Sequence, residues 1–593
     1  MTLNPVSAYL RSGSQLLAPT SITLVVTKLT LCSLAIYACT SLFHAFFVSS
    51  LRHIPGPWYT KFTGIVRKYH AWRHKEHHYF IQLFERYGPI VRVGPTKVGV
   101  GEITMFRKMM SSHEMPKSQM YTDFSAVGEN IFTTRSPEFN KARRRQIGPA
   151  FASAYVRKME PLIMSEGVDQ VCQLFDTQIC AAKHMGQDRT VTNLYYAFTM
   201  MATDVISSLA YGRRFGAVDT LVTKAEASLQ LSQQSTPRQS QETKVASEAP
   251  LQQSHQSTAR PSQDLGVSEN HASFESQETS HTVLEYMIGT MMLMGLMAEA
   301  PFINALPQRL LPQGIQRLFA LRDNFMRFTC TTVGQYRSWM ALQRTSGKSE
   351  ARNDILSAYI SAQDPETGAT LSDCEIASES TVLLAAGTDT TANIMVNSVR
   401  LLLSHPEKYA RVRDELRAAF PNGAETITYV TAIEKLPYLS AVIYETLRLR
   451  ASTSGVWPRD APRPSGVSIG GHFIPPGTVI CGSIGGVHLN PETWPTPKLF
   501  VPERFLGAEG ELRKRNVVAF SAGVRMCPGR HLAMMELVMT LSTVLLKYDL
   551  DLISSPAVPA TDYFAKVDEV CHITTTFRHP ERDCNFYISR STC

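Results

Sequence analysis

The hydrophobic pattern contains one long apolar run near the amino terminus. Residues 29–48 read LTLCSLAIYACTSLFHAFFV and carry no formal charge apart from that of His44. As an α-helix this run would be about 30 Å long, which matches the hydrocarbon core of a bilayer. The pattern therefore predicts a single transmembrane anchor at 29–48.

The charges beside this run predict its orientation. Residues 49–75 carry Arg52, Lys61, Arg67, Lys68, Arg73 and Lys75, whereas only Arg11 and Lys28 precede the run. Because positive flanks stay in the cytoplasm, residues 1–28 are expected on the lumenal side and the bulk of the chain in the cytoplasm. A cleaved signal peptide is the alternative, but the apolar run is longer than a usual signal and no clear small-residue cleavage site ends it.

Two further segments punctuate the chain. Pro55 and Pro57 predict a stiff, non-helical hinge at 49–60, since proline fixes φ and removes a hydrogen-bond donor. Between 231 and 280, 20 of 50 residues are Ser or Gln and Phe274 is the only aromatic. Such a composition does not bury enough apolar surface to fold, so we expect a disordered insertion at about 226–282 within one catalytic domain, 61–593.

The remaining pattern is mostly helical. Residues 193–210 and 283–299 are rich in Met, Leu and Ala, and 404–420 form an amphipathic repeat that ends before Pro421. Short β-prone runs at 90–101 and 466–483 are interrupted by Gly and Pro. The predicted fold class is mainly α with small β-sheets, preceded by one transmembrane helix.

The amino-acid composition excludes few functional classes of protein. Eleven cysteines without CxxC pairs or finger-like Cys/His spacing indicate a reducing compartment and mostly free thiols. Lys and Arg exceed Asp and Glu by 59 to 51, a diffuse surplus that gives no support for nucleic-acid binding. An anionic membrane surface or an acidic protein partner is compatible with it.

One cysteine has unusual neighbours. Cys527 lies in FSAGVRMCPGRHLA, between a β-prone run and a predicted helix that begins near Pro528. A helix amino terminus favours a thiolate, which is a nucleophile or a metal ligand. A buried structural cysteine is the alternative. The nearby glycines suit a flat partner close to the backbone, and Arg525 suits an anionic group of that partner.

Two helical segments carry isolated charges. Asp389 is the only charged side chain in residues 380–399, and it stands beside threonines, so it is costly unless hydrogen-bonded or used. Ala386 and Gly387 leave room for a ligand near the backbone; an ordinary buried helix with a surface aspartate is the alternative. Glu445 and Arg448 stand at i and i+3 and so share a helix face. Most pairs at this spacing are solvated ion pairs that stabilise a helix only slightly.

Taken in order, these motifs identify a family. FSAGVRMCPG (520–529), AGTDTT (386–391), ETLR (445–448) and PERF (502–505) resemble the signature segments of a cytochrome P450, a haem-thiolate monooxygenase. The likeness runs from the anchor and the PGP hinge to near the carboxyl end. The anchor and its cytoplasmic orientation resemble the microsomal branch of the family. The general character of the chain resembles secondary-metabolism enzymes of fungi.

The resemblance implies a role for each matching residue. Cys527 would bind the iron of haem b, Phe520 would pack beside the sulfur, and Gly529 completes the motif around it. The cations that would pair with the haem propionates are Arg525, Arg459 and Arg144. Asn140 stands where the family usually has Trp or His, which leaves one propionate contact open, with Lys141 as a possible substitute.

On the other face of the haem the resemblance implies proton delivery. Thr390 would order the water network of the oxygen site, and Asp389 would feed protons to it. Glu445, Arg448 and Arg504 would form a buried triad that supports the fold and takes no part in catalysis.

The resemblance also implies partners. Electrons would come from NADPH through a membrane-bound reductase, with cytochrome b5 as a further partner, at the endoplasmic reticulum membrane. The apolar pocket segments predict a lipophilic small-molecule substrate. Two alternatives stay open: a haem-thiolate isomerase or dehydratase of the same fold, and a membrane-anchored haem-binding protein without turnover.

Overall fold

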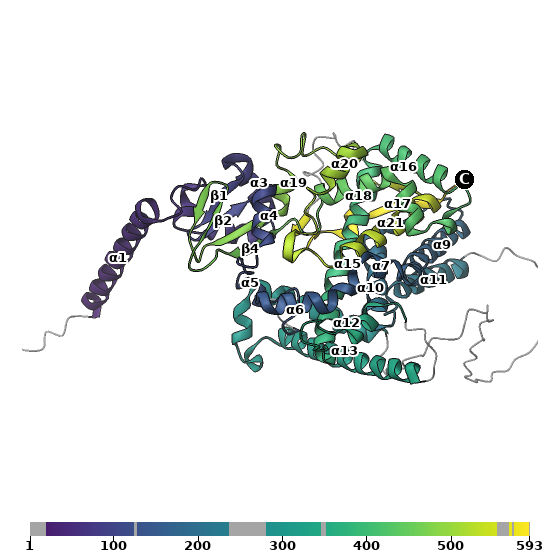
Figure 1. The fold of residues 1–593 in the computed structure, drawn as a ribbon, viewed down its shortest axis with the longest axis horizontal. Helices are drawn as coiled ribbons and strands as arrows, with labels where there is room; N and C mark the ends of the chain where they lie inside the picture. Colours follow the sequence, from purple (N-terminus) through teal and green to yellow (C-terminus); the bar gives the residue numbers. More distant parts are fainter. Residues whose placement is uncertain are drawn as a thin grey trace, which may run out of the picture.

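Helices dominate the protein, as the sequence predicts (Figure 1). The computed structural model describes residues 19–123, 127–235, 280–345, 352–553, 569–571 and 574–591. The helices in these ranges are α1 (Pro19–Phe43), α2 (Ile65–Trp72), α3 (Glu76–Tyr87), α4 (Ile103–Ser111), α5 (Met120–Asp123), α6 (Pro137–Ile147), α7 (Ser153–Arg157), α8 (Glu160–Ile163), α9 (Asp169–His184), α10 (Leu194–Tyr211), α11 (Ala217–Ser235), α12 (Ser280–Glu299), α13 (Gln313–Thr345), α14 (Ile355–Ser361), α15 (Asp373–Leu403), α16 (Pro406–Ala419), α17 (Tyr429–Lys435), α18 (Pro437–Leu449), α19 (Ile484–His488), α20 (Gly507–Lys514), α21 (Arg530–Lys547) and α23 (Pro580–Asp583).

The strands form small sheets at the periphery. They are β1 (Ile90–Gly94), β2 (Lys97–Val100), β3 (Thr190–Asn193), β4 (Val456–Asp460), β5 (Val467–Ile469), β6 (His472–Ile474), β7 (Val479–Ser483), β8 (Tyr548–Leu552), β9 (Glu569–Cys571), β10 (Thr575–Phe577) and β11 (Asn585–Arg590). One sheet has the order β1-β2-β7-β4, with β2 and β7 parallel and the other pairs antiparallel. A second, antiparallel sheet has the order β3-β11-β8, and β5/β6 and β9/β10 are two-stranded.

Helix α15 runs through the centre of the largest hydrophobic core, where α10 and α21 pack on it (Figure 1). A capping box fixes its start: Ser372 Oγ accepts the Glu375 N–H, and Glu375 Oε2 accepts the Ser372 N–H at 3.0 Å. Gly387 allows the close approach of α10, because a Cβ there would lie 2.8 Å from Ile206 Cδ1. Gly387 therefore allows a neighbouring helix to approach, and together with Ala386 it also lines the cavity described below.

The amino-terminal region differs from the prediction. Helix α1 begins at Pro19, includes Lys28 and ends at Phe43, and a π-helical turn, His44–Val48, follows it. Among the described residues, no helix combines the length and the apolar character that crossing a membrane requires, so the predicted span at 29–48 is not supported. Most of the segment predicted to be lumenal, 1–18, lies outside the described residues.

The predicted hinge at 49–60 is non-helical until a short 3₁₀-helix, Trp58–Lys61, begins, and it is attached to the sheet. The Arg92 N–H in β1 donates to the Pro55 carbonyl at 2.7 Å, and Arg92 Nη2 donates to Ser49 Oγ at 3.0 Å. Gly56 is needed at this contact, since a Cβ there would lie 2.6 Å from the Arg92 carbonyl oxygen. The connector is thus fixed along the edge of the catalytic domain.

The bounds of the predicted insertion also change. Helix α11 continues to Ser235 and α12 starts at Ser280, so both ends of the predicted 226–282 segment are helical. Ala, Leu and Gln are good helix formers, and they extend the pattern of α11 beyond residue 226. Residues 236–279, on which the prediction of disorder mainly rests, lie outside the described residues.

A buried ionic triad joins α18 to the segment before α20. Arg448 Nε and Nη2 donate to the two carboxylate oxygens of Glu445 at 2.7 and 2.8 Å, and Arg504 Nε donates to Glu445 Oε1 at 3.2 Å. The Glu445 and Arg448 side chains are fully buried. Arg448 also donates to the carbonyls of His488 and Pro497 at 2.9 and 2.7 Å. The predicted triad is confirmed as a structural cross-link.

Glu445→Ala should destabilise the fold strongly, because it leaves two buried arginines without their acid. We expect the free energy of unfolding to fall by about 3–5 kcal/mol, measured by chemical denaturation. Glu509→Ala is the matched control: it removes an exposed carboxylate that pairs with Arg513 at 3.0 Å, and it should cost less than about 1 kcal/mol. Equal losses in the two variants would contradict a structural role for the triad.

Candidate active site

A largely apolar cavity lies between α15, the start of α21 and β4. Ile131, Phe132, Val382, Leu383 and Trp457 supply hydrophobic wall on one side, and Phe520 and Leu532 supply it on the other. Seven of the eight predicted site residues line this cavity, and Asp389 does not. Segments separated by hundreds of residues therefore meet where the sequence motifs predicted.

Cys527 lies in a tight turn directly before α21. Its N–H donates to the Phe520 carbonyl at 2.8 Å, and α21 starts three residues later at Arg530, with Gly529 as its N-cap. The sulfur is accessible from the cavity, and protein atoms surround it on its other sides. Gly523 makes the turn possible: its φ is +59°, and a Cβ there would lie 2.5 Å from Ser111 Cα. This glycine serves packing against α4.

The electrostatics of Cys527 correct one expectation. Burial raises the pKa of the thiol, and the opposing effects of the Gly529 N–H, Arg144 and Arg530 do not overcome it. The start of the helix alone therefore does not make this sulfur a thiolate. A directly bound cation such as a metal ion would do so, because coordination deprotonates a thiol.

Four cations surround one side of the cavity. Arg144, Arg459, Arg525 and Lys117 all line it, and none of them forms an ion pair within the described part of the chain. Burial, together with Arg459 and Arg144, lowers the pKa of Arg525 to about 10, and its Nη1 has no hydrogen-bond partner among the described residues. Concentrated buried charge of one sign indicates a site for an anionic group.

The other cations are oriented by neutral partners. Arg459 Nη1 donates to the Tyr121 hydroxyl at 3.2 Å and to the Pro458 carbonyl at 3.1 Å. Arg144 Nη2 donates to the Met526 carbonyl at 2.7 Å, which connects α6 to the residue before Cys527. These contacts fix both guanidinium groups without neutralising them, so both remain available to an anion.

Lys117 is a cavity residue that the sequence reasoning missed. Its Nζ donates to the Phe132 carbonyl and lies 4.5 Å from the centroid of the Tyr121 ring. Burial, followed by repulsion from Arg459, Arg525 and Arg144, lowers its pKa well below the usual range. The sequence gives only a weak signal for Lys117, which directly precedes residues 118–132, a segment predicted to line the pocket.

Neither Asn140 nor Lys141 contributes a side chain to the cavity. Asn140 is fully buried and does not line the cavity, and its amide atoms lack partners in the described structure. Lys141 is exposed and does not line the cavity either. Lys117, from a different segment, is the lysine that lines the cavity.

On the opposite wall, Thr390 and Asp389 face different directions. Thr390 lines the cavity, and its Oγ1 donates to the Ala386 carbonyl at 2.6 Å. Ser452 Oγ donates to the Thr390 carbonyl at 2.7 Å, which fixes this turn of α15. The Asp389 carboxylate lies away from the cavity and accepts a 3.4 Å hydrogen bond from the Tyr195 hydroxyl. Burial raises the pKa of Asp389.

Two further buried acids line the cavity and were not predicted. Glu536 in α21 has one carboxylate oxygen without a partner among the described residues, and burial raises its pKa to about 8. Glu379 in α15 accepts the Ile131 N–H at 3.0 Å and pairs with Arg143, and burial raises its pKa to about 7. Glu536 is a single acid in an apolar helix, the same signal that identified Asp389, whereas Glu379 follows Asp373 and Glu375 and has no such signal.

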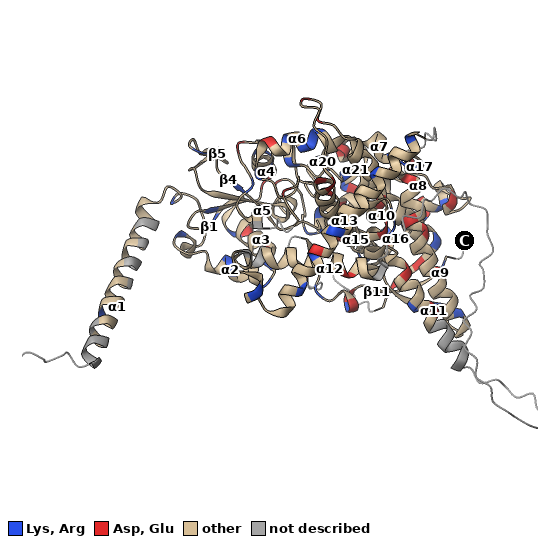
Figure 2. Ribbon diagram, turned by 90° about the horizontal axis from the view of Figure 1, so that it is seen from below, with Lys and Arg blue, Asp and Glu red and all other residues tan. Residues whose placement is uncertain are grey.

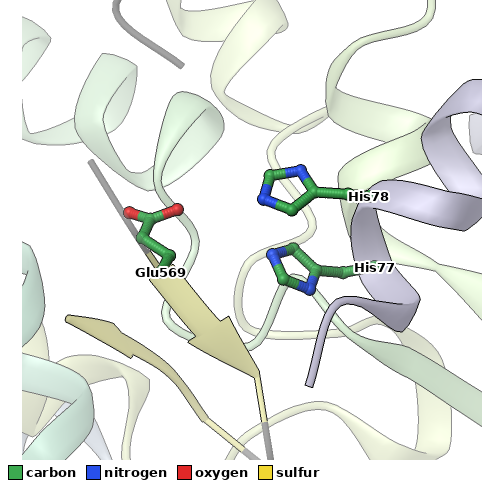
Figure 3. Close-up of side chains that lie close together, drawn as sticks. All are labelled: His77, His78 and Glu569. Atoms are coloured by element: carbon green, nitrogen blue, oxygen red, sulfur yellow. The ribbon is translucent and has the colours of Figure 1, made fainter. Parts of the chain in front are cut away.

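A separate cluster brings together His77, His78 and Glu569, at the β9 hairpin (Figure 3). The Glu569 carboxylate already pairs with Arg450 at 2.8 Å, and Lys75 Nζ donates to the Glu569 carbonyl at 2.6 Å. Burial, His78, Lys75 and Arg450 all lower the pKa of His77. Since two cations already occupy the surroundings of the carboxylate, we assign no metal ion to this cluster.

The arrangement of the cavity agrees with the comparison to known families. A sequence model of the cytochrome P450 family matches residues 54–243 and 271–567. The chain belongs to the cytochrome P450 family.

Similar proteins agree with this membership over nearly the whole chain. Cytochrome P450 monooxygenase helB2 of Aspergillus fumigatus is 28% identical, with 93% of this chain and 96% of that protein covered. Cytochrome P450 monooxygenase BipB of Cochliobolus sativus is 26% identical, with 85% and 86% covered. The crystal structure of a cytochrome P450DA heme domain superposes with a TM-score of 0.64 at 19% identity, covering 91% of this chain and 98% of that chain, which shows the fold. The chain is thus an enzyme of the cytochrome P450 monooxygenase class.

The cavity fits the haem that the P450 family implies. Cys527 lines the cavity and would be the iron ligand, and the Arg525 Nη1 that lacks a partner among the described residues, with the three neighbouring cations, would hold the two propionates of a haem. Haem, when bound, supplies the iron on which O₂ is activated. The protein would supply the Cys527 sulfur as an iron ligand, the cations that hold the propionates and the apolar wall.

Lys117→Met should weaken haem retention, because it removes one of four buried cations facing the propionates. A charge-assisted hydrogen bond contributes roughly 1.5–3 kcal/mol, so haem transfer to an acceptor protein should be about tenfold faster or more. Lys141→Met is the matched control, since Lys141 is exposed outside the cavity. Equal haem-loss rates in the two variants would remove Lys117 from the site.

Proposed function

We propose that this P450 inserts one oxygen atom from O₂ into a lipophilic small molecule, using electrons that NADPH supplies through a reductase. The observation that carries the proposal is the composition of a single cavity. It combines the Cys527 sulfur, a group of unneutralised cations and, on the facing wall, Thr390 with Asp389 behind it. The proposed overall reaction is RH + O₂ + 2e⁻ + 2H⁺ → ROH + H₂O.

The Asp389 and Thr390 pair favours monooxygenation over the two alternatives. Reducing O₂ with loss of water needs two protons at the oxygen site, whereas an isomerase or dehydratase of this fold takes no protons from a relay to O₂. A haem-binding protein without turnover would need neither group. An acid of raised pKa next to a cavity hydroxyl is suited to delivering protons.

The walls of the cavity support a lipophilic substrate. Phe132, Val382, Leu383 and Trp457 present apolar surface beside Thr390. Val382 and Phe132 also pack in an apolar cluster with Leu293, Met294 and Met297 of α12 and Phe319 of α13, so apolar side chains back this wall of the cavity. Together with its fungal relatives, this surface supports an intermediate of secondary metabolism as the substrate class.

We propose an acidic redox partner at the Cys527 side of the molecule. Lys141, Arg157 and Arg530 are exposed on α6, α7 and the first turn of α21, the elements around Cys527, and α6 is visibly basic in Figure 2. A reductase, and cytochrome b5 where it takes part, would dock there through complementary charge.

We further propose that the enzyme works at the cytoplasmic face of the endoplasmic reticulum, held there by its amino-terminal residues. In support, Leu29, Ile36 and Phe47 in and after α1 are each at least 60% exposed, and large exposed apolar side chains favour contact with lipid. Helix α1 also projects away from the catalytic domain (Figure 1).

Cys527→Ser should abolish the spectrum of thiolate-bound haem. The reduced wild-type protein under CO should show a strongly red-shifted Soret band, and the variant should lose it because a hydroxyl does not replace the thiolate. Cys180→Ser, an exposed cysteine on α9, should keep the wild-type band. An unchanged spectrum in Cys527→Ser would contradict the ligand assignment.

Thr390→Ala should separate NADPH consumption from product formation. Loss of the cavity hydroxyl removes a group that orders protonating water, so product formed per NADPH should fall by roughly tenfold with haem content unchanged. Thr388→Ala is a close control, because Thr388 makes the same type of bond, to the Leu384 carbonyl at 2.9 Å, outside the cavity. Undiminished coupling in Thr390→Ala would count against the relay.

A further inference from the structure

The carboxylate of Asp389 lies at the inner end of a line of hydroxyl groups. The Tyr195 hydroxyl donates to Asp389 Oδ1 at 3.4 Å, and Thr576 Oγ1 donates to the Tyr195 hydroxyl at 3.1 Å. All three side chains are partly buried, whereas the adjacent Tyr196 is exposed. The line therefore leads from near the surface, through one tyrosine, to the acid behind the cavity.

Three separate elements bring these groups together. Asp389 is in the middle of α15, Tyr195 is in the first turn of α10, and Thr576 is the central residue of β10. The Asn193 side chain caps α10 by accepting the Tyr196 N–H at 3.1 Å, and the Phe577 ring packs edge-on against Tyr195 at 6.0 Å. The tyrosine is thus fixed by its helix cap and by a neighbouring ring.

We propose that Tyr195, held by Thr576, passes protons from the solvent side to Asp389, from where they reach the cavity. This inference rests on the proposed monooxygenase function, which consumes two protons per turnover. Tyr195 is a positioning and relay residue: it contacts Asp389 and neither the substrate nor the haem site.

The proposed step balances without any redox partner. When the protonated Asp389 releases its proton toward the cavity, the Tyr195 O–H bond breaks and a new O–H bond forms at Asp389 Oδ1. The Tyr195 oxygen takes the Thr576 hydroxyl proton at the same time, and Thr576 takes a proton from a solvent hydronium ion, which becomes water. One proton enters for each proton delivered, and every hydroxyl group is restored.

The environment of the line suits a neutral relay. Burial raises the pKa of Tyr195, with Asp389 adding to the effect, so the phenol stays protonated and able to donate. Burial raises the pKa of Asp389, and the Tyr195 hydrogen bond opposes this rise. Within the described part of the chain, Tyr195 is the titratable group that acts on Asp389, and Cys584 adds slightly to the raised pKa of Tyr195.

Infrared titration of the ferric holoenzyme tests the contact without turnover. Comparison with Asp389→Asn assigns the carboxyl band of Asp389. In Tyr195→Phe this band should move to higher frequency and titrate at a higher pH, because the carboxylate loses the hydrogen bond that stabilises it. Tyr196→Phe, the same change one residue along the helix, should leave the band and its midpoint unchanged. An unaffected Asp389 band in Tyr195→Phe would overturn the inference.

Turnover then tests the function of the relay. Tyr195→Phe should lower the rate of product formation by about tenfold, less than the roughly 10²- to 10⁴-fold typical of losing a general acid, and should increase the solvent deuterium isotope effect. Thr576→Val should act in the same direction, and Tyr196→Phe should match the wild type. If the wild type couples NADPH to product and Tyr195→Phe equals it, only the relay is overturned; if the wild type forms no product with any lipophilic candidate, the proposed function fails with it.

Discussion

Buried positive charge around the cavity is the constraint on which the site depends. Lys117, Arg144, Arg459 and Arg525 come from four different segments and face one another with no acid from the described chain between them. Burial, followed by repulsion from Arg459 and Arg144, lowers the pKa of Arg525, so the arrangement is unfavourable for the protein alone. A dianionic haem would supply the acids that these cations lack, so folding of the cavity and retention of the cofactor are expected to be coupled.

The same coupling explains the state of Cys527. Its pKa is raised by burial, and Arg144 is the positive group that connects it to the cation cluster through the Met526 carbonyl. An iron ion bound at the sulfur would favour the thiolate, and the propionates of the same haem would neutralise the arginines. One cofactor would therefore satisfy both the buried sulfur and the buried cations.

Sequence reasoning succeeded where the signal is local. The turn around Cys527 and the i, i+3 pair of Glu445 and Arg448 are each recognised within one short segment, and the structure contains both. Thr390 lines the cavity, whereas the carboxylate of the neighbouring Asp389 lies away from it. It failed where the signal depends on a distant partner. Lys117 is an ordinary lysine until β4 and α6 bring Arg459 and Arg144 beside it, and Gly523 serves contact with α4, a neighbour that its own segment does not reveal.

The amino-terminal region illustrates a different limit. An apolar run predicts a helix but not where that helix begins, and α1 starts ten residues before the predicted anchor and includes Lys28. Likewise, the low-complexity composition after residue 226 did not show that α11 continues to Ser235, because helix formers such as Ala, Leu and Gln occur in both kinds of segment.

Helix α15 finally shows how one element separates two tasks. Successive residues of an α-helix point about 100° apart, so Thr390 faces the cavity while Asp389 faces Tyr195. Residues on the cavity side are available to a substrate, whereas Tyr195 on the outer side affects the pKa and hydrogen bonding of Asp389 without lining the pocket. In the proposed relay, the adjacent acid and hydroxyl would connect a proton source on one side of a central helix to an apolar site on the other.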